Sequence, residues 1–470
     1  MIQSKYGPVN SQRMHILTYG CQMNDYESDR TYRLFHNKYG YSWADHPHDA
    51  DLVIFNTCSI REKADQKAFS ALGELKKTKA ERKQHMIIAV GGCSAQLRGK
   101  EIQSKFPFVD IVFGTHQWNI LPELVEACLT KNKRQSNLDL FGWQKYSFLD
   151  VEKHQEQDKH PVTELITVQN GCDKFCSFCV VPYTRGRQVS RDLDDICREV
   201  EKVAQKGTKE VILLGQNVNA YGNDKSSDIG FSKLLRSVAA VDGIERIRYV
   251  TSHPSELSFE MIDTMAELDE VCNSLHLPIQ SGSNRVLKAM NRDYTVDRFR
   301  EVANYLYKTI PDMILTTDLM VAFPGETEED FKDTLSAMEE FNFAESFSFL
   351  YSPRPNTKAA KREADFIPTE VGKQRLYELQ DLQNKLSMQA RQNYLGKTVK
   401  VLVDGVSARD GQQITGKMPQ NWSVNFDGSK SLIGKVVDVK IDQVMSNTFK
   451  GQLISAVQEE QPSKVLPSVG

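Results

Sequence analysis

The sequence lacks any long hydrophobic run. Its longest apolar stretches, such as Met86–Val90 and Val211–Leu214, are far shorter than the ~20 residues that cross a bilayer. The opening segment Met1–Met14 is polar and has no apolar core of the kind found in secretory signals. These two absences predict a cytoplasmic protein with no membrane partner.

An excess of positive charge is also missing. The chain contains 59 Lys and Arg against 62 Asp and Glu, a formal net charge of −3, so no global positive field attracts nucleic acid. A nucleic-acid partner would therefore have to be bound by a local patch. Hydrophobic residues fill 40% of the 470 positions, which excludes wholesale disorder. At roughly 150 residues per domain, this length predicts about three domains.

A disulfide framework is the third feature that the sequence lacks, because the number of cysteines is odd and no export signal is visible. The nine cysteines are Cys21, Cys58, Cys93, Cys128, Cys172, Cys176, Cys179, Cys197 and Cys272. The open question is which of these thiols bind a metal. Cys128, Cys197 and Cys272 have no partner at a ligand-like spacing, and we expect them to pack in the core.

Residues 12–131 predict a doubly wound α/β domain. Short apolar runs alternate with amphipathic helical patterns, which indicates a parallel sheet. The expected strands are 14–19, 50–56, 85–90 and 110–113, and the expected helices are 25–39, 60–82, 96–105 and 119–131. Cys21, Cys58 and Cys93 each follow a strand, and ligands bind at the carboxyl ends of parallel strands. We therefore predict that these three thiols converge on one site.

Residues 158–390 repeat the strand–helix alternation six times, which predicts a partial (β/α)6 barrel. The active site of such a barrel lies at the carboxyl ends of its strands. The expected strands are 164–169, 210–215, 247–252, 274–280, 314–323 and 345–352, with a long helix over 369–394. The preceding stretch Gly142–Pro161 is polar and without a clear period, and is predicted to be a linker.

Residues 393–457 contain short β-rich runs separated by turn signals, with no helix between them. This pattern predicts a small antiparallel β-barrel. The runs are 398–403, 413–417, 422–426, 435–444 and 449–454. Residues 394–455 contain 8 basic and 5 acidic side chains, a net charge of +3 in a chain that is negative overall. The tail after residue 457 is expected to fray.

The strongest motif is the loop that follows the first barrel strand. Cys172, Cys176 and Cys179 lie within eight residues of one another. Thiolates select soft metals and iron–sulfur clusters. A structural zinc site takes four ligands, usually as two close cysteine pairs, and the loop offers no second pair. Because three thiols on a four-iron cluster leave one iron open to another molecule, the loop favours a cluster over zinc.

This CxxxCxxC loop resembles that of the radical S-adenosylmethionine (SAM) superfamily. Other motifs resemble the methylthiotransferase family within that superfamily, and they are Tyr19–Asn24, Asn56–Ala64, Gly91–Cys93, Cys179–Tyr183, Arg185–Arg187 and Ser190–Arg191. The terminal β-module resembles a TRAM domain, an RNA-binding barrel. The resemblance covers nearly the whole chain, in order.

The resemblance implies SAM and two [4Fe-4S] clusters as cofactors. The thiols of the Cys172–Cys179 loop would hold the cluster that binds SAM, whose reductive cleavage provides a radical. Cys21, Cys58 and Cys93 would hold an auxiliary cluster that supplies sulfur. One SAM would methylate this sulfur, and another would provide the radical. No protein acid, base or nucleophile is expected, because the cofactors carry the chemistry.

The amino-terminal motifs also resemble one branch of this family. Gly20–Asn24 reads Gly-Cys-Gln-Met-Asn, whereas the branch that modifies a ribosomal-protein aspartate typically reads Gly-Cys-Pro-Lys-Asn. The resemblance therefore implies action on tRNA, converting the N6-isopentenyladenosine beside the anticodon to 2-methylthio-N6-isopentenyladenosine. The implied partners are the tRNA anticodon stem-loop, an electron-donor protein and a sulfur or iron–sulfur carrier.

Further site residues are predicted from strand ends, from charge and from the resemblance. The candidates for binding SAM are Phe178, Gly215, Gln216, Asn217, Ser252, Gln280 and Arg191. The candidates for binding substrate are Arg185, Arg187, Asp318, Arg354 and Lys358. Arginine forks suit both a carboxylate and an RNA phosphate, and solvated surface charge is the alternative role for each arginine.

Two other functions stay open at this point. The first is the same chemistry on a protein side chain. The second is a non-catalytic iron–sulfur protein that binds RNA or senses redox state. The placement of six cysteines at strand ends disfavours this second function, because a binding protein needs no open iron.

Overall fold

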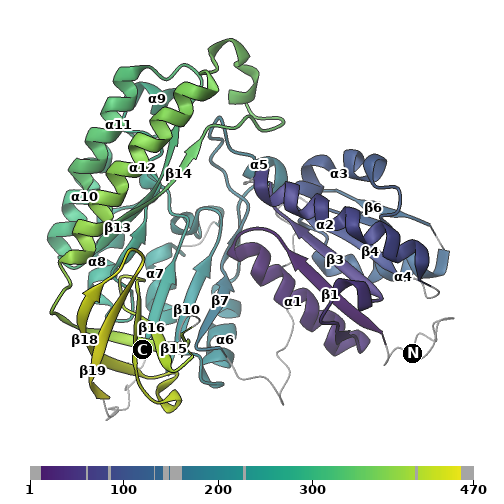
Figure 1. Cartoon of the computed structure of the whole chain (residues 1–470), viewed down its shortest axis with the longest axis horizontal. Coiled ribbons are helices and arrows are strands. Elements are labelled where there is room, and N and C mark those ends of the chain that lie inside the picture. The colour runs from purple at the N-terminus through teal and green to yellow at the C-terminus, as the bar shows by residue number, and fades with distance from the viewer. Residues whose placement is uncertain are drawn as a thin grey trace.

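The computed structural model describes residues 12–59, 62–82, 86–131, 133–140, 148, 161–225, 229–407 and 411–456. Along the chain these residues form an amino-terminal α/β domain, a central α/β core and a terminal β-barrel (Figure 1). The predicted linker and tail lie outside the described residues, apart from Phe148 and Pro161. None of the described helices is long and apolar enough to cross a membrane.

The amino-terminal domain has a six-stranded parallel sheet in the order β2-β1-β3-β4-β5-β6. Its strands are β1 (Arg13–Thr18), β2 (Ser42–Trp43), β3 (Leu52–Thr57), β4 (Ile87–Gly92), β5 (Ile111–Phe113) and β6 (Gln135–Asn137). The sequence predicted four of them. It missed β2 and β6 because two or three mostly polar residues carry no hydrophobic period.

Helices cover both faces of this sheet, and they are α1 (Gln22–Tyr39), α2 (Glu62–Glu81), α3 (Cys93–Lys105) and α4 (Leu121–Lys131). Successive side chains of a strand point to opposite faces. In β3, Leu52 and Ile54 therefore pack with α1 and α4, whereas Val53 and Phe55 pack with α2 and α3. The predicted doubly wound fold is confirmed.

The central core is a partial barrel of six parallel strands in two three-stranded sheets. The strands are β7 (Thr163–Thr167), β10 (Glu210–Leu214), β11 (Arg246–Tyr249), β12 (Ser274–His276), β13 (Ile314–Val321) and β14 (Glu345–Leu350). A parallel bridge between Ile247 and Val271 joins the two sheets. The outer helices are α6 (Leu193–Ala204), α7 (Phe231–Ala239), α8 (Phe259–Glu267), α10 (Val296–Thr309), α11 (Glu328–Phe341) and α12 (Thr369–Gln392). The predicted partial barrel is confirmed.

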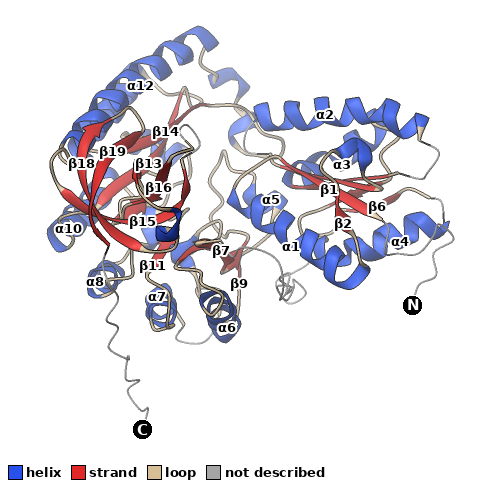
Figure 2. Cartoon of the chain, turned by 60° about the horizontal axis from the view of Figure 1, so that its bottom comes forward, coloured by secondary structure: helices blue, strands red, loops and turns tan. Residues whose placement is uncertain are grey.

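The amino-terminal domain docks against the inner side of this barrel. Val211 and Leu213 of β10 pack with the outer helices, so Ile212 and Leu214 point inward. There they contact Met23 and Tyr26 of α1. Helix α1 and strand β7 accordingly lie side by side in Figures 1 and 2.

The terminal domain is a closed five-stranded barrel, seen at the left of Figure 2. Its strands are β15 (Thr398–Val406), β16 (Gln413–Lys417), β17 (Ser423–Asp427), β18 (Val436–Val444) and β19 (Thr448–Ala456), in the order β15-β16-β17-β19-β18. The prediction of an antiparallel barrel is wrong for one pair, because β17 and β19 run parallel. Strand β18 pairs with both β15 and β19. The free edge of β19 then meets that of β17, and these two strands run in the same direction where the barrel closes.

Candidate metal centres

The first thiol site is a loop whose conformation depends on Gly171 and on Gln216, which follows the end of β10. It follows β8 (Gln169–Asn170). Gly171 has φ 77°, and a Cβ there would lie 2.1 Å from the carbonyl oxygen of Arg187, so the position requires glycine. The Gly171 N–H donates to Oε1 of Gln216 at 2.6 Å, and the Cys172 N–H donates to the Gly186 carbonyl at 3.2 Å.

Each sulfur of this loop accepts one N–H group. The backbone N–H groups of Lys174 and Val181 donate to Cys172 and Cys179 at 3.4 and 3.5 Å. The Arg292 guanidinium donates to Cys176 Sγ at 3.2 Å. Burial raises the pKa of Cys172 to about 11 and that of Cys179 to about 12, so metal binding here would release protons.

The second thiol site lies where three neighbouring strands of the amino-terminal sheet end. Thr57 of β3 stands opposite Gly92 of β4, so Cys58 and Cys93 follow at the same level. Cys21 caps the start of α1, just beyond β1. The three strand ends that the sequence predicted to meet are therefore adjacent in the structure.

A network of amide side chains joins these strand ends. The Asn24 amide donates to Oδ1 of Asn56 at 2.6 Å and to the Thr57 carbonyl at 3.2 Å. The Asn56 amide donates in return to the Asn24 carbonyl at 2.9 Å. The Thr57 hydroxyl donates to the Gly91 carbonyl at 2.6 Å. These contacts explain why Asn and Thr accompany the cysteines in the sequence motifs.

Glycine is required beside Cys93. Gly92 has φ 92°, and a Cβ there would lie 2.4 Å from the Thr57 carbonyl oxygen and 2.7 Å from Oδ1 of Asn56. Any larger residue would therefore push the ends of β3 and β4 apart and separate their cysteines.

The donor set of both sites fits an iron–sulfur cluster better than a single ion. All nine cysteines carry thiols, and no three His, Cys, Asp or Glu side chains within the described ranges form a site for one metal ion. In a cluster each thiolate binds a different iron, so the sulfurs need not meet at one point. Ser59 and Ser94, which follow Cys58 and Cys93, have buried hydroxyls without a hydrogen-bond partner among the described residues. Such orphaned hydroxyls fit a site that takes a polar group.

The mouth of the barrel contains strained backbone beside the thiol loop. Thr251, Gln280 and Ala322 follow β11, β12 and β13 and have φ values of 65°, 72° and 57°. Residues other than glycine rarely adopt this region, and such strain gathers at functional sites. The Thr251 hydroxyl donates to the Gly215 carbonyl at 2.6 Å, which ties two strand ends together.

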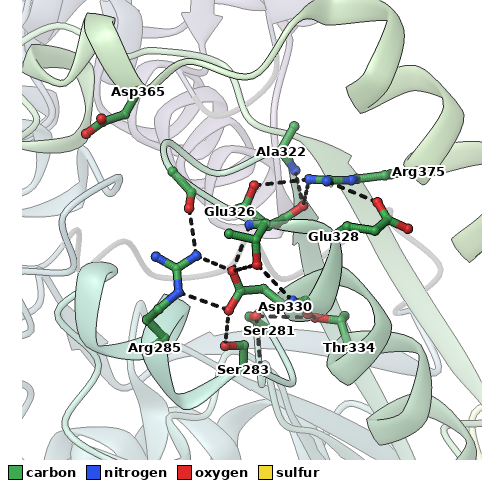
Figure 3. Close-up of polar contacts among 12 residues, drawn as sticks. Ser281, Ser283, Arg285, Ala322, Glu326, Glu328, Asp330, Thr334, Asp365 and Arg375 are labelled. Carbon is green, nitrogen blue, oxygen red and sulfur yellow. Dashed lines mark hydrogen bonds and ion pairs between the residues drawn. The ribbon is translucent and has the colours of Figure 1, made fainter.

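A polar network supports the Ala322 turn (Figure 3). Glu326 Oε1 accepts from the Ala322 N–H at 3.0 Å and from Arg375 of α12 at 2.8 Å. Arg285 of α9 (Asn284–Ala289) pairs with Asp330 and donates to the Gly325 carbonyl at 2.7 Å. The turn leads into Phe323, whose ring packs edge-on against that of Phe178, with the ring centroids 6.5 Å apart.

The predicted SAM-binding residues all lie at the barrel mouth or directly beside it. Asn217 Oδ1 and Ser252 Oγ are buried without a partner among the described residues, which fits contact with a bound polar ligand. Gln216 instead holds the Gly171 amide, and Gly215 packs against Gln169. Arg191 is buried and paired with Glu199. Phe178 is half-buried and Gln280 is buried.

The predicted substrate-binding residues are more scattered. Asp318 Oδ1 lies 3.5 Å from Nε2 of His276 on the inner side of the barrel. Arg187 is exposed and contacts Asp173 at 2.7 Å. Lys358 is exposed and Arg354 half-buried, and Pro355 lines a cavity of about 580 Å³ between the two α/β domains.

Arg185 has a different position from the one expected for a substrate contact. It is 3% exposed, and it forms an ion pair with Glu27 of the amino-terminal domain at 2.7 Å. In this arrangement its guanidinium is closed off from RNA. Its predicted role as a phosphate or SAM contact therefore has no support in these contacts.

Sequence reasoning missed several residues of the site. Arg292 follows Cys179 by more than a hundred residues and carries no motif of its own. His276 and Phe347 line the inner side of β12–β14 near Asp318, with ring centroids 5.9 Å apart. Every second residue of β13 is buried against the outer helices, so the residues between them face the inside of the barrel. Together with the predicted partial barrel, this alternation could have identified the inner face from the sequence.

Comparisons with known proteins agree with this architecture. Residues 13–114 match the uncharacterized protein family UPF0004, residues 166–338 the Radical SAM superfamily and residues 392–454 the TRAM domain. The solved structure of the radical S-adenosylmethionine methyltransferase TsrM from Kitasatospora setae covers 74% of this chain and 75% of its own length, with a TM-score of 0.57. At 15% identity, that likeness shows the fold alone.

Two relatives are similar over nearly the full length. The tRNA-2-methylthio-N(6)-dimethylallyladenosine synthase of Aeromonas salmonicida (strain A449) is 43% identical over 454 residues, which are 96% of this chain and 93% of the relative. The synthase of the same name from Hydrogenovibrio crunogenus is 41% identical over 474 residues, 98% of each chain.

The fold and the thiol loop define a radical SAM protein, a class that uses a [4Fe-4S] cluster and SAM. Within this class, the chain belongs to the family of the tRNA-2-methylthio-N(6)-dimethylallyladenosine synthases, which are methylthiotransferases.

Proposed function

We propose that the chain converts N6-isopentenyladenosine beside the tRNA anticodon to its 2-methylthio derivative, using two molecules of SAM. One observation carries this proposal. Two separate thiol trios are present in a chain that is 43% identical, over 96% of its length, to a tRNA-2-methylthio-N(6)-dimethylallyladenosine synthase. A protein that only binds RNA would need neither trio.

Cys172, Cys176 and Cys179 are the proposed ligands of the cluster that binds SAM. When bound, this cluster supplies the electron for reductive cleavage of SAM, a step that polar side chains cannot provide. The chain's own contribution is to position SAM. In this proposal the unpartnered Asn217 Oδ1 accepts a hydrogen bond from a polar group of SAM, and the unpartnered Ser252 hydroxyl accepts or donates one. Phe178, packed on Phe323, offers an apolar surface for the adenine ring.

Cys21, Cys58 and Cys93 are the proposed ligands of the auxiliary cluster, the source of the inserted sulfur. Docking of α1 against β7 brings this site to the inner side of the barrel. In this proposal the two sites face a shared space, because the auxiliary cluster must reach the activated carbon of the base to deliver sulfur. Reductive cleavage of SAM takes up one electron, and each methylthio product takes one sulfur atom from the protein. We therefore also propose an electron-donor protein and a sulfur or iron–sulfur carrier as partners.

The inner side of β12–β14 is the proposed place of the target base. Met23 and Tyr26 cover the inner side of the opposite strands, whereas Phe347 remains 53% exposed. An exposed aromatic ring beside Asp318 and His276 suits a base that stacks and forms hydrogen bonds. A base in a single-stranded loop can turn into this space at modest unstacking cost.

The terminal barrel is proposed to supply affinity for tRNA. It matches the TRAM domain, its charge is positive, and it carries no cluster ligand. Arg354 and Lys358 are further proposed contacts to the anticodon stem. Phosphate contacts by such residues would make tRNA affinity fall as salt rises.

Three substrates offered side by side to the reconstituted protein test the proposal. They are tRNA carrying isopentenyladenosine, unmodified tRNA, and the ribosomal protein that sister enzymes modify. Mass spectrometry of nucleosides and peptides should detect methylthio product from the first and none from the third. The unmodified base lacks the apolar tail, which should weaken its binding in the transition state by about 1–3 kcal/mol. Little product is therefore expected from it. A preference for the protein substrate would contradict the proposal.

A further inference from the structure

Arg185 links the two thiol sites through a short stretch of chain. It comes six residues after Cys179 and caps α5 (Val181–Thr184). Its side chain leaves the core and enters the amino-terminal domain. There its NH1 and NH2 groups donate to Oε1 and Oε2 of Glu27 at 2.7 and 3.3 Å. Both side chains are at most 5% exposed, so this two-point contact is shielded from water.

Further contacts fix the direction of this side chain. Arg185 NH1 also donates to Oδ1 of Asn170 at 3.1 Å, and the Arg185 carbonyl accepts from the Asn170 amide at 3.3 Å. His116 of the amino-terminal domain lies 2.8 Å from the same carbonyl through Nε2. Because backbone and guanidinium are both held, the position of the charge is fixed by contacts within the protein.

The fixed guanidinium lies against the second thiol site. Its ion-pair partner Glu27 lies on α1, which Cys21 caps, and α5 contacts α3, which begins at Cys93. The positive charge of Arg185 therefore acts on both thiols. The first site has a counterpart, because Arg292 donates to Cys176 Sγ at 3.2 Å. Each trio therefore has one arginine beside it, but only Arg185 comes from another domain.

We propose that Arg185 is a positioning residue of the auxiliary site, held there by Glu27, and that its buried positive charge beside Cys21 and Cys93 sets the reduction potential of the cluster. This inference rests on the auxiliary cluster of the proposed function. Hydrogen bonds to cluster sulfur and nearby positive charge favour the reduced, more negative state. Removing the guanidinium should therefore make the cluster harder to reduce. Docking of the two domains would then be a condition for a correctly tuned auxiliary cluster.

The test uses full-length protein in which Cys172, Cys176 and Cys179 are all replaced by alanine, so that only the auxiliary cluster contributes signal. Anaerobically reconstituted protein is titrated with reductant and followed by electron paramagnetic resonance. Arg185→Met should lower the midpoint potential and change the line shape. Arg185→Lys, which keeps the charge but loses the fork, should give a smaller shift.

Arg30→Met is the matched control. Arg30 of α1 is a buried arginine that pairs with Glu199 of α6 across the same domain interface. This variant loses an interdomain ion pair without removing the charge beside the thiols, so midpoint and line shape should match the parent protein. If Arg30→Met shifted the midpoint as much as Arg185→Met, domain docking alone would account for the effect and the proposal would fall.

An unchanged midpoint in Arg185→Met with iron retained also overturns the proposal. If that variant does not fold, Arg185→Lys and Glu27→Gln carry the test, and unchanged midpoints in both contradict it. Absence of any cluster signal in the parent protein is a different outcome. It would remove the auxiliary cluster from the proposed function, and this inference with it.

Discussion

The two thiol sites are built in opposite ways. Cys172, Cys176 and Cys179 lie in one loop of one domain, and their N–H donors come from that loop and from Arg292 of the same domain. Cys21, Cys58 and Cys93 are separated by 37 and 35 residues, and their site also receives a guanidinium from a second domain. The first site therefore depends on local sequence, whereas the second depends on strand register and domain docking.

Replacing each trio by alanine should separate the two sites most strongly. Loss of Cys172, Cys176 and Cys179 should abolish SAM cleavage altogether. Loss of Cys21, Cys58 and Cys93 should leave SAM cleavage and abolish the methylthio product. Chromatography of SAM cleavage products and mass spectrometry of tRNA nucleosides measure the two activities. The half-buried Cys197 is the control, and Cys197→Ala should keep both. Loss of SAM cleavage after replacement of Cys21, Cys58 and Cys93, with the fold intact, would show that the sites are not separable.

Disrupting the attachment of the terminal barrel should leave both thiol sites alone. Arg248 pairs with buried Glu210 at 2.8 Å and donates to the carbonyls of Met418 and Pro419. Arg248→Met leaves a buried carboxylate without its partner, which should cost about 3–5 kcal/mol. Native-state hydrogen exchange around Met418 and tRNA affinity should both report the loss.

The control for this prediction is the exposed ion pair of Arg236 with Glu267. Arg236→Met should cost no more than about 1 kcal/mol, because exposed pairs contribute little. An Arg248→Met variant with unchanged exchange and tRNA affinity would mean that the barrel is held by other contacts.

Removing the arginine of the first site should slow SAM cleavage without affecting the second site. Besides Cys176 Sγ, Arg292 contacts the Pro278 carbonyl at 2.8 Å and the Tyr294 hydroxyl at 2.9 Å. Loss of such a ligand-supporting donor typically costs about 10–100-fold in activity. Arg292→Met should show this loss in SAM cleavage, whereas the exposed Arg298→Met should not. Equal rates in both variants would remove Arg292 from the site.

The smallest expected effect concerns backbone strain, which differs between the domains. Ala322 has φ 57° at the barrel mouth, whereas no residue other than glycine has positive φ in the described part of the amino-terminal domain. Ala322→Gly relieves this strain but adds chain entropy, so it should stabilise the protein by less than about 1 kcal/mol. Ala240, with φ −74°, is the control, and Ala240→Gly should instead destabilise. Thermal unfolding midpoints that fall equally in both would contradict the account.

The sequence predicts most of the fold and the location of both cysteine trios, because the patterns that indicate them lie within short segments of the chain. The loop cysteines, the buried strand β3 and the alternating strand β13 were predicted because spacing and hydrophobic period are local properties. The adjacency of the strand ends that precede Cys21, Cys58 and Cys93 followed from a general rule about parallel sheets.

What could not be predicted depends on packing between distant segments. The Arg185–Glu27 pair spans 158 residues, and no local pattern shows whether an arginine is buried or exposed. The parallel pairing of β17 with β19 likewise follows from closure of the barrel rather than from either strand. The role of Gln216 in holding Gly171 arises from the loop conformation.

Iron content tests the central claim, two independent thiol sites, most directly. Anaerobically reconstituted wild-type protein should contain about eight iron atoms per chain, from two four-iron clusters. Mössbauer spectra of each triple alanine variant should then show about half of that iron, as one four-iron cluster. A wild-type protein with only about four iron atoms, or loss of all iron from either folded variant, would contradict the account.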